Sequence, residues 1–218
     1  MRIFDFIVSL IGIVILSPVF LFAALLIICT SPGPIGYSQK RVGRNGRLFS
    51  LYKFRSMVVN ADRIGSSVTT GKDHRITKVG RVLRKTKLDE LPQLWNVLKG
   101  DMSFVGPRPD VPEIINNYTG AMKRILEVRP GITSNASLHL RNEVDLLSLA
   151  REPDKAYEEI FVPAKVGLAM EHVHRKSFLF DFGILLQTVW VITVGRVVLP
   201  TKEHPVVKEI KQAIERMK

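Results

Sequence analysis

The longest apolar stretch of the chain lies near its beginning. No charged residue occurs between Phe6 and Gln39, and the segment from Ile7 to Cys29 is apolar almost throughout. A helix over that segment, at about 1.5 Å per residue, is long enough to cross the core of a bilayer. Hydropathy alone therefore predicts a single transmembrane anchor.

Ser17 and Pro18 interrupt this stretch near its middle. Pro18 has no backbone N–H, so the Val14 carbonyl loses its helical partner, and we expect the Ser17 hydroxyl to replace it. Each half is then about 16 Å long, and a helix that breaks and returns to the same membrane face fits as well as a kinked span. Basic residues begin at Lys40 and favour the cytoplasmic side, so the rest of the chain faces the cytoplasm in both cases.

A hairpin and a short helix are predicted next. Asn45-Gly46 is typical of a hairpin turn, with Leu48–Arg55 as the returning strand. Lys53 and Arg55 are two residues apart and so lie on the same face of that strand. Two cations about 7 Å apart suit a diphosphate. Residues 77–85 have the spacing of a short helix with apolar and basic positions.

Leucines at helical spacing predict another helix, which ends at Gly100. We expect Thr86 to be its N-cap, and Pro92 to lie in its first turn or to kink it. Asp89 and Glu90 then lie at the amino end of a helix, where the backbone N–H groups and the helix dipole favour carboxylates.

Positive charge is concentrated in one window. The net charge is +12, and residues 40–87 hold fourteen Lys or Arg against two Asp, which accounts for all of it. Such a field attracts an anionic membrane surface, nucleic acid or a phosphorylated small molecule. We expect it to keep both Asp89 and Glu90 ionised at neutral pH. Since 46% of the 218 residues are hydrophobic, a disordered basic tail is excluded.

Ionised carboxylates among phosphate-binding cations have two natural chemical roles. They hold Mg²⁺ together with substrate phosphate oxygens, or one of them attacks phosphorus and forms an acyl phosphate. An adjacent acid pair also caps helices and forms salt bridges, and the spacing of Asp89 and Glu90 alone favours that structural role.

Several blocks of the sequence, in order and spacing, resemble the bacterial sugar transferases. The blocks are Lys53-Phe54-Arg55-Ser56-Met57, Asp73-His74-Arg75-Ile76-Thr77, Leu83-Arg84-Lys85-Thr86, the run from Leu88 to Ser103, and Val105-Gly106-Pro107-Arg108-Pro109. More narrowly, the chain from about Phe4 to Ile192 looks like a small monotopic phosphoglycosyl transferase. That class initiates glycan assembly on polyprenyl phosphate.

The resemblance implies a two-step exchange. Asp89 attacks the β-phosphate of a UDP-sugar and releases UMP, and polyprenyl (undecaprenyl) phosphate then displaces the phosphosugar from Asp89. Glu90 assists as a base or orienting carboxylate, and Mg²⁺, with Asp89 as its protein ligand, neutralises the diphosphate. This is the first membrane step of bacterial glycoconjugate synthesis, at the inner membrane with the catalytic domain facing the cytoplasm.

The resemblance also implies further substrate-binding residues. Arg84 falls on the family's phosphate-binding arginine. Pro107 and Pro109 fix the backbone of a loop near the nucleotide, in which Arg108 binds phosphate or uracil. The further cation candidates are Lys53, Arg55, Arg75 and Arg141. The segment from Ser134 to Asn142 departs from the family pattern, so the sequence leaves the sugar open.

The expected fold is α+β and mostly helical. Residues 1–36 form the re-entrant membrane helix, which the resemblance favours over a span, and residues 37–200 a compact cytosol-facing catalytic domain with a small β-hairpin and interfacial helices. Residues 201–218 form an amphipathic helix suited to an anionic membrane or a partner helix. The apolar segment 177–198 is interfacial, because Asp181 and Arg196 leave too few residues between them to span.

The expected partners are a UDP-sugar, polyprenyl phosphate and anionic membrane lipid, with no nucleic acid; a homo-oligomer stays open. A hypothesis from another class is a membrane-tethered basic module that binds nucleic acid or anionic lipid, for which Asp89 is dispensable. A third is a scaffold with a degenerate catalytic pair, against which the intact Asp89-Glu90 argues.

Overall fold

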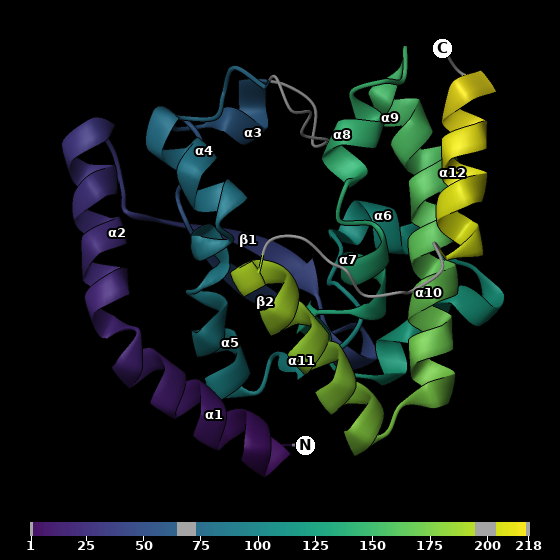
Figure 1. Cartoon of the computed structure of the whole chain (residues 1–218), viewed down its shortest axis with the longest axis horizontal. Helices are drawn as coiled ribbons and strands as arrows, with labels where there is room; N and C mark the ends of the chain where they lie inside the picture. The colour runs from purple at the N-terminus through teal and green to yellow at the C-terminus, as the bar shows by residue number, and fades with distance from the viewer. Residues whose placement is uncertain (1, 65–72, 195–203, 217–218) are drawn as a thin grey trace.

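The computed structural model describes residues 2–64, 73–194 and 204–216. These residues form a mostly helical α+β structure with two small sheets (Figure 1), as the sequence predicts. The longer helices are α1 (Arg2–Ile15), α2 (Ser17–Thr30), α10 (Val162–Arg175), α11 (Phe178–Val194) and α12 (Pro205–Arg216). Helix α10 continues a π-helical turn, η4 (Tyr157–Phe161), which itself follows the short helix α9 (Pro153–Ala156).

The apolar stretch at the start of the chain forms two helices rather than one. Helices α1 and α2 meet at an angle of 59°. At the bend the Ser17 hydroxyl donates a hydrogen bond of 2.8 Å to the Val14 carbonyl, which is the carbonyl that Pro18 leaves without a helical partner. The predicted break and its repair by Ser17 are therefore both confirmed.

The predicted hairpin is present, and a helix packs closely against its end. Strands β1 (Gly36–Val42) and β2 (Leu48–Phe54) pair antiparallel around the turn η1 (Arg44–Gly46). Helix α4 (Lys78–Lys85) begins at Thr77, whose hydroxyl accepts from the Gly80 N–H at 2.8 Å. A Cβ atom at Gly80 would lie 1.9 Å from the Ser56 carbonyl oxygen, so only glycine allows this approach.

The acid pair occupies a short connecting turn rather than the first turn of a long helix. A 3-10 turn, η2 (Leu88–Glu90), precedes α5 (Gln93–Lys99), with Pro92 as the N-cap of α5. The expectation that Thr86 is the N-cap is wrong. Its hydroxyl bonds back to the Val82 carbonyl at 2.8 Å and it ends α4 instead, because the chain reverses at Lys87, where φ is +60°.

A parallel pair of strands, which the sequence did not predict, positions the proline-rich loop, residues Gly106 to Pro109. Strand β3 (Ser103–Val105) pairs with β4 (Gly131–Thr133). Beyond the pair, the Gly131 N–H donates to the Pro107 carbonyl at 2.9 Å. A Cβ atom at Gly131 would lie 2.1 Å from the Gly106 nitrogen. The two glycines therefore allow the backbones of two distant segments to touch.

Short helical segments and one hydrophobic cluster complete the described chain. The segments are α3 (Ala61–Ile64), α6 (Pro112–Asn116), η3 (Gly120–Glu127), α7 (Asn135–His139) and α8 (Glu143–Leu147). Helix α12 packs its buried Val207, Ile210 and Ile214 into a cluster with Phe161 and Leu168. The helix predicted in residues 201–218 is thus present, but its apolar face is inside the molecule rather than free for a membrane or a partner.

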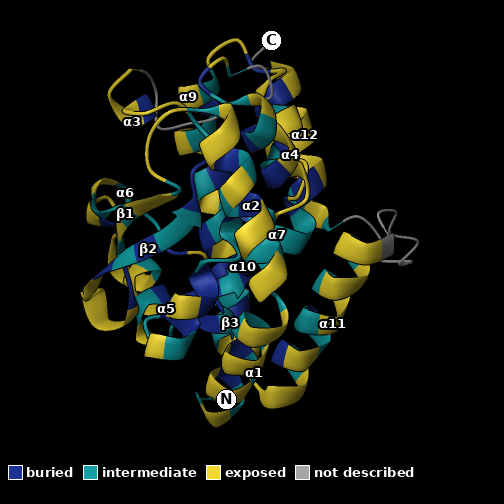
Figure 2. Ribbon diagram, turned by 90° about the vertical axis from the view of Figure 1, so that its left-hand side faces the viewer, coloured by how far each residue is buried: buried dark blue, intermediate teal, exposed yellow. Residues whose placement is uncertain are grey.

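Most of the exposed large apolar residues lie on three helices, α1, α2 and α11, and Figure 2 shows many exposed positions along all three. On α11, Leu179 is 80% exposed and Leu186 55%, while Asp181 turns inward and is 1% exposed. In the described part of the chain, no single helix is long and apolar enough to cross a bilayer. Helices α1 and α2 meet that criterion only as a bent pair.

Candidate active site

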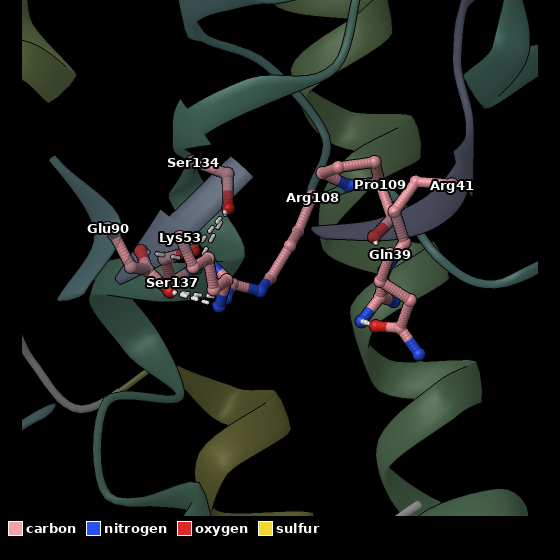
Figure 3. Close-up of polar contacts among 8 residues, drawn as sticks. All are labelled: Gln39, Arg41, Lys53, Glu90, Arg108, Pro109, Ser134 and Ser137. Carbon is pink, nitrogen blue, oxygen red and sulfur yellow. Dashed lines mark hydrogen bonds and ion pairs between the residues drawn. The ribbon is translucent and has the colours of Figure 1, made fainter. Parts of the chain in front are cut away.

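Glu90 is held by two cations that come from distant parts of the chain. Its Oε1 atom accepts from Lys53 Nζ of β2 at 3.0 Å and from Arg108 Nη2 at 2.6 Å (Figure 3). The Glu90 side chain is 11% exposed, against 20% for Lys53 and 39% for Arg108. The structure thus brings together three of the residues that the sequence singles out.

The two cations determine the charge state of Glu90. Burial alone raises the pKa of Glu90, but the charges of Arg108 and Lys53 outweigh it and hold this pKa well below the ordinary value. In return, Glu90 raises the pKa of Arg108. Burial lowers the pKa of Lys53, and Glu90 opposes that shift. Glu90 is therefore ionised at neutral pH, as expected.

Asp89 lies in a different environment from its neighbour. It is 5% exposed, and its buried Oδ1 atom has no hydrogen-bond partner within the described residues. Burial raises the pKa of Asp89, although Lys53, Lys87 and Arg84 lower it in part. For Asp89 the effect of burial exceeds the attraction of the cations, so its pKa shifts in the opposite direction from that of Glu90. That Asp89 is ionised at neutral pH stays a prediction.

Asn96, which no sequence pattern singled out, fixes the acid pair relative to the hairpin. This fully buried side chain of α5 donates to the Ser50 carbonyl at 2.8 Å and accepts from the Tyr52 N–H at 3.1 Å. It therefore ties the helix that follows Asp89-Glu90 to the strand that carries Lys53. A polar residue among the leucines of an apolar helix face was the available signal.

The proline-rich loop presents Arg108 to the acids. Pro107 and Pro109 are buried on either side of it, while Arg108 is exposed. The Pro109 carbonyl accepts from Arg41 Nη1 at 3.2 Å (Figure 3). The loop backbone is thus held at both flanks, and the guanidinium between them is preorganised.

Two further predicted site residues are Arg84 and Arg141. Arg84 is close enough to lower the pKa of Asp89. Arg141 is exposed in the turn between α7 and α8, and the nearby Glu143 raises the pKa of Arg108. The segment that departs from the family pattern therefore ends near Arg108.

Arg55 and Arg75 are engaged elsewhere. The Arg55 guanidinium donates to the carbonyls of Ser31 and Pro32, just after α2. Arg75 pairs with Asp73, with Nη2 and Oδ2 2.6 Å apart. The expected clamp of Lys53 and Arg55 is not formed, because the Arg55 guanidinium is bound by the two carbonyls just after α2 instead.

The oxygen ligands that this site offers suit a hard cation such as Mg²⁺ only in part. Within the described ranges, no three His, Cys, Asp or Glu side chains come together as a metal site. The unpartnered Oδ1 atom of Asp89 is an oxygen ligand of the type that Mg²⁺ takes. Because Mg²⁺ is commonly held by one or two carboxylates with substrate phosphates and water, this set fits Mg²⁺ bound together with a diphosphate.

A carboxylate pair with two convergent cations is an arrangement that suits a ligand with phosphate groups. Residues 1–195 match the model of one family, described as bacterial sugar transferase. The chain belongs to the bacterial sugar transferase family, as the sequence blocks indicated.

Curated relatives cover the chain to different extents. The exopolysaccharide production protein ExoY of Sinorhizobium fredii is 34% identical over 210 residues, 89% of this chain and 86% of the relative. The galactosyl transferase CpsE of Streptococcus agalactiae is 40% identical over 174 residues, 75% of this chain and 35% of the relative. The UDP-N-acetylgalactosamine-undecaprenyl-phosphate N-acetylgalactosaminephosphotransferase of Aeromonas hydrophila is 42% identical over 137 residues, which are 62% of this chain and 32% of the relative. The chain thus spans about a third of the length of these last two relatives.

Proposed function

We propose that this protein transfers a sugar 1-phosphate from a UDP-sugar to undecaprenyl phosphate, releases UMP and so starts the synthesis of a bacterial glycoconjugate. Membership of the bacterial sugar transferase family supports the reaction class. The substrate classes are supported by the Aeromonas hydrophila relative, whose name states both a UDP-sugar and undecaprenyl phosphate.

One observation carries the proposed mechanism: Asp89 is buried, and its Oδ1 atom has no partner among the described residues. An unpartnered buried carboxylate oxygen costs free energy and is retained where a ligand or a reacting atom completes it. Glu90, by contrast, is already occupied by two cations. Asp89 is therefore the better nucleophile, and Glu90 the residue that organises the cations.

The reaction then balances in two displacements. An Asp89 carboxylate oxygen bonds to the β-phosphorus of the UDP-sugar while the bond from that phosphorus to the bridging oxygen breaks, and UMP leaves with the electron pair. A phosphate oxygen of undecaprenyl phosphate next bonds to the same phosphorus and Asp89 leaves as carboxylate. Lys53 and Arg108 stabilise charge on the phosphoryl oxygens.

Mg²⁺ is the proposed cofactor, with Asp89 as its protein ligand and the diphosphate of the donor as the other. When bound, it neutralises phosphate charge and stabilises the leaving UMP. The basic residues of this chain orient the substrate with or without it, since Arg84 and Lys53 lie close enough to Asp89 to lower its pKa.

The proposed location is the cytoplasmic membrane of a bacterium, with the catalytic residues on the cytoplasmic side. The support is the apolar face of α1, α2 and α11 and the bend at Ser17-Pro18. A re-entrant α1–α2 pair holds the acids at the depth of lipid phosphates, where the acceptor's phosphate also lies.

The test is UMP release by the detergent-purified chain with Mg²⁺, undecaprenyl phosphate and each of a panel of UDP-sugars. Asp89→Asn is expected to reduce release to background. Asp62→Asn removes the same charge from an exposed position in the same basic window and should leave release unchanged. Turnover by Asp89→Asn at the rate of the unmodified chain would exclude Asp89 as the nucleophile.

A second measurement isolates the covalent step. Without acceptor lipid, intact-mass analysis should show the unmodified chain heavier by one phosphosugar, and Asp89→Asn at its own mass. An adduct that persists in Asp89→Asn contradicts the assignment. If no UDP-sugar yields UMP and the chain binds DNA with a steep salt dependence, the basic binding module is the better hypothesis.

A further inference from the structure

A second cluster of cations surrounds a cavity that shares no residue with the acid pair and its partners. The cavity has a volume of about 160 Å³ and lies between α1, η1, β3, the end of η3 and the connection from α10 to α11. Arg44, Arg129 and Lys176 contribute three cations to its wall, and Asp5 and Glu127 contribute two acids. The proposed function uses none of these residues.

Both acids in the wall are engaged within the protein. Asp5 accepts from the Ser103 hydroxyl at 2.8 Å and from the Phe104 N–H at 3.4 Å. The Glu127 carboxylate lies 3.6 Å from the Arg124 guanidinium. Both acids thus have partners within the protein, and the three cations of the wall outnumber them.

The cations themselves are largely free. Arg44 uses its Nε–H on the Glu127 carbonyl at 2.9 Å, which leaves its terminal nitrogens available. Arg129 and Lys176 form no hydrogen bond or ion pair with another residue in the described portion of the chain. Burial lowers the pKa of Lys176, and the charges of Arg44 and Arg129 lower it further, whereas Asp181 and Asp5 raise it. A bound anion would relieve this repulsion.

Apolar side chains next to the cavity indicate what kind of anion it takes. Phe178 follows Lys176 by two residues and packs edge-to-face on Phe4 of α1, with the ring centroids 6.0 Å apart. Ile3 is 77% exposed and Leu179 80%. An anion in the cavity thus lies beside the exposed apolar residues of both α1 and α11. A soluble phosphate makes no contact with these apolar residues. A lipid, in contrast, has both an anionic head group for the cavity and apolar chains for the residues beside it.

We propose that this cavity binds the phosphate of an anionic membrane lipid, through Arg44, Arg129 and Lys176, with the acyl chains along α1 and α11. The site is separate from the one proposed for catalysis. It would fix the start of α1 and the α10–α11 corner at the membrane surface.

Native mass spectrometry of the full chain in detergent micelles tests this site. The probes are phosphatidylglycerol and phosphatidylcholine with identical acyl chains, at equal mole fractions. The unmodified chain should retain phosphatidylglycerol in preference. Each removed cation should weaken that retention about fivefold, which is the effect of one basic side chain near an anionic surface. The test variant is Arg129→Gln with Lys176→Gln.

The matched control removes two exposed lysines at the other end of the molecule, Lys155→Gln with Lys208→Gln. It should bind as the unmodified chain does. Equal retention of phosphatidylglycerol by the test and control variants overturns the proposal. If the double test variant does not melt cooperatively, Lys176→Gln alone decides, because that exposed connector residue can change without disturbing the core.

A binding measurement with soluble phosphates distinguishes a lipid phosphate from a free one. Glycerol 1-phosphate and inorganic phosphate, added without lipid, should bind far more weakly than phosphatidylglycerol. If either binds the unmodified chain as tightly as the lipid does, the cavity takes free phosphate and the lipid assignment is wrong.

Discussion

Two carboxylates that are adjacent in the sequence, Asp89 and Glu90, have opposite effects on folding. Burial raises the pKa of Asp89, whereas Arg108 and Lys53 overcome burial and hold the pKa of Glu90 low. Ionised Asp89 is therefore less favourable in the folded than in the unfolded chain, and its contribution to stability is lost as pH rises through its raised pKa. The contribution of Glu90 is present above its unfolded pKa and is lost as pH falls through the depressed one.

Thermal unfolding at neutral pH should reveal this contrast. Asp89→Asn should raise the melting temperature by about 3 °C, since removing an unsatisfied buried charge gains on the order of 1 kcal/mol. Glu90→Gln should lower it by about 6 °C, since about 2 kcal/mol is lost when Lys53 and Arg108 face one another unpaired. Scanning fluorimetry in detergent measures both. A lower melting temperature for Asp89→Asn would show that its carboxylate is paired and structural.

The rate should also depend on pH through Asp89. Only the ionised carboxylate is a nucleophile, so UMP release should fall on the acid side, with a midpoint above the value of about 4 for an ordinary aspartate. Lys53 lowers the pKa of Asp89, so Lys53→Gln should move that midpoint to higher pH. The measurement is kcat/KM against pH.

The control for this shift is Arg47→Gln, which removes an exposed cation of the hairpin. It should leave the midpoint where it is. An identical midpoint in Lys53→Gln and the unmodified chain would mean that Asp89 is not the titrating group.

For single residues, the sequence predicts which residues belong to the site better than it predicts which residues they contact. Ser17-Pro18 was predictable because the lost hydrogen bond and its substitute lie within three residues. The pairing of Lys53 with Glu90 joins residues 37 positions apart, and no local pattern specifies it. Strand alternation did not predict the position of the Arg55 side chain either, because its guanidinium binds carbonyls more than twenty residues earlier in the chain.

Among the elements, α4 is positioned by a glycine rather than by its apolar residues alone. Gly80 allows the helix to contact the Ser56 backbone at the end of the β2 segment. That contact fixes Arg84 on α4 relative to Lys53 on β2, and so orients two cations near Asp89. The hydrophobic spacing of residues 77–85 predicts the helix, but not which strand it approaches or how closely.

Two helical glycines offer a matched test of this packing. Gly80→Ala forces a Cβ atom to within 1.9 Å of the Ser56 oxygen, and should cost at least about 2 kcal/mol of unfolding free energy. A Cβ atom at Gly167 of α10 meets nothing within 4 Å, so Gly167→Ala should stabilise by about 0.5–1 kcal/mol. Chemical denaturation compares them, and equal effects would contradict the close approach of α4 to β2.

At the scale of the whole molecule, most of the exposed large apolar residues that the structure describes lie on α1, α2 and α11, and the acid pair lies in the turn just before α5. Helix α1 is joined to α5 by Arg2, whose guanidinium donates to the Val97 and Leu98 carbonyls at the carboxyl end of α5. A cation there also interacts favourably with the helix dipole. The position of α1 is therefore transmitted to the helix that follows Asp89 and Glu90.

The topology of α1 and α2 is the last point that this arrangement predicts. If the pair enters and leaves by one face, an affinity tag before Met1 and a tag after Lys218 both lie in the cytoplasm. An impermeant reagent applied to intact cells should label neither tag, and should label both after the membrane is opened. A spanning pair would instead expose the tag at Met1 alone. Such labelling would place α1 across the bilayer and would leave the 59° bend as a kink within a span.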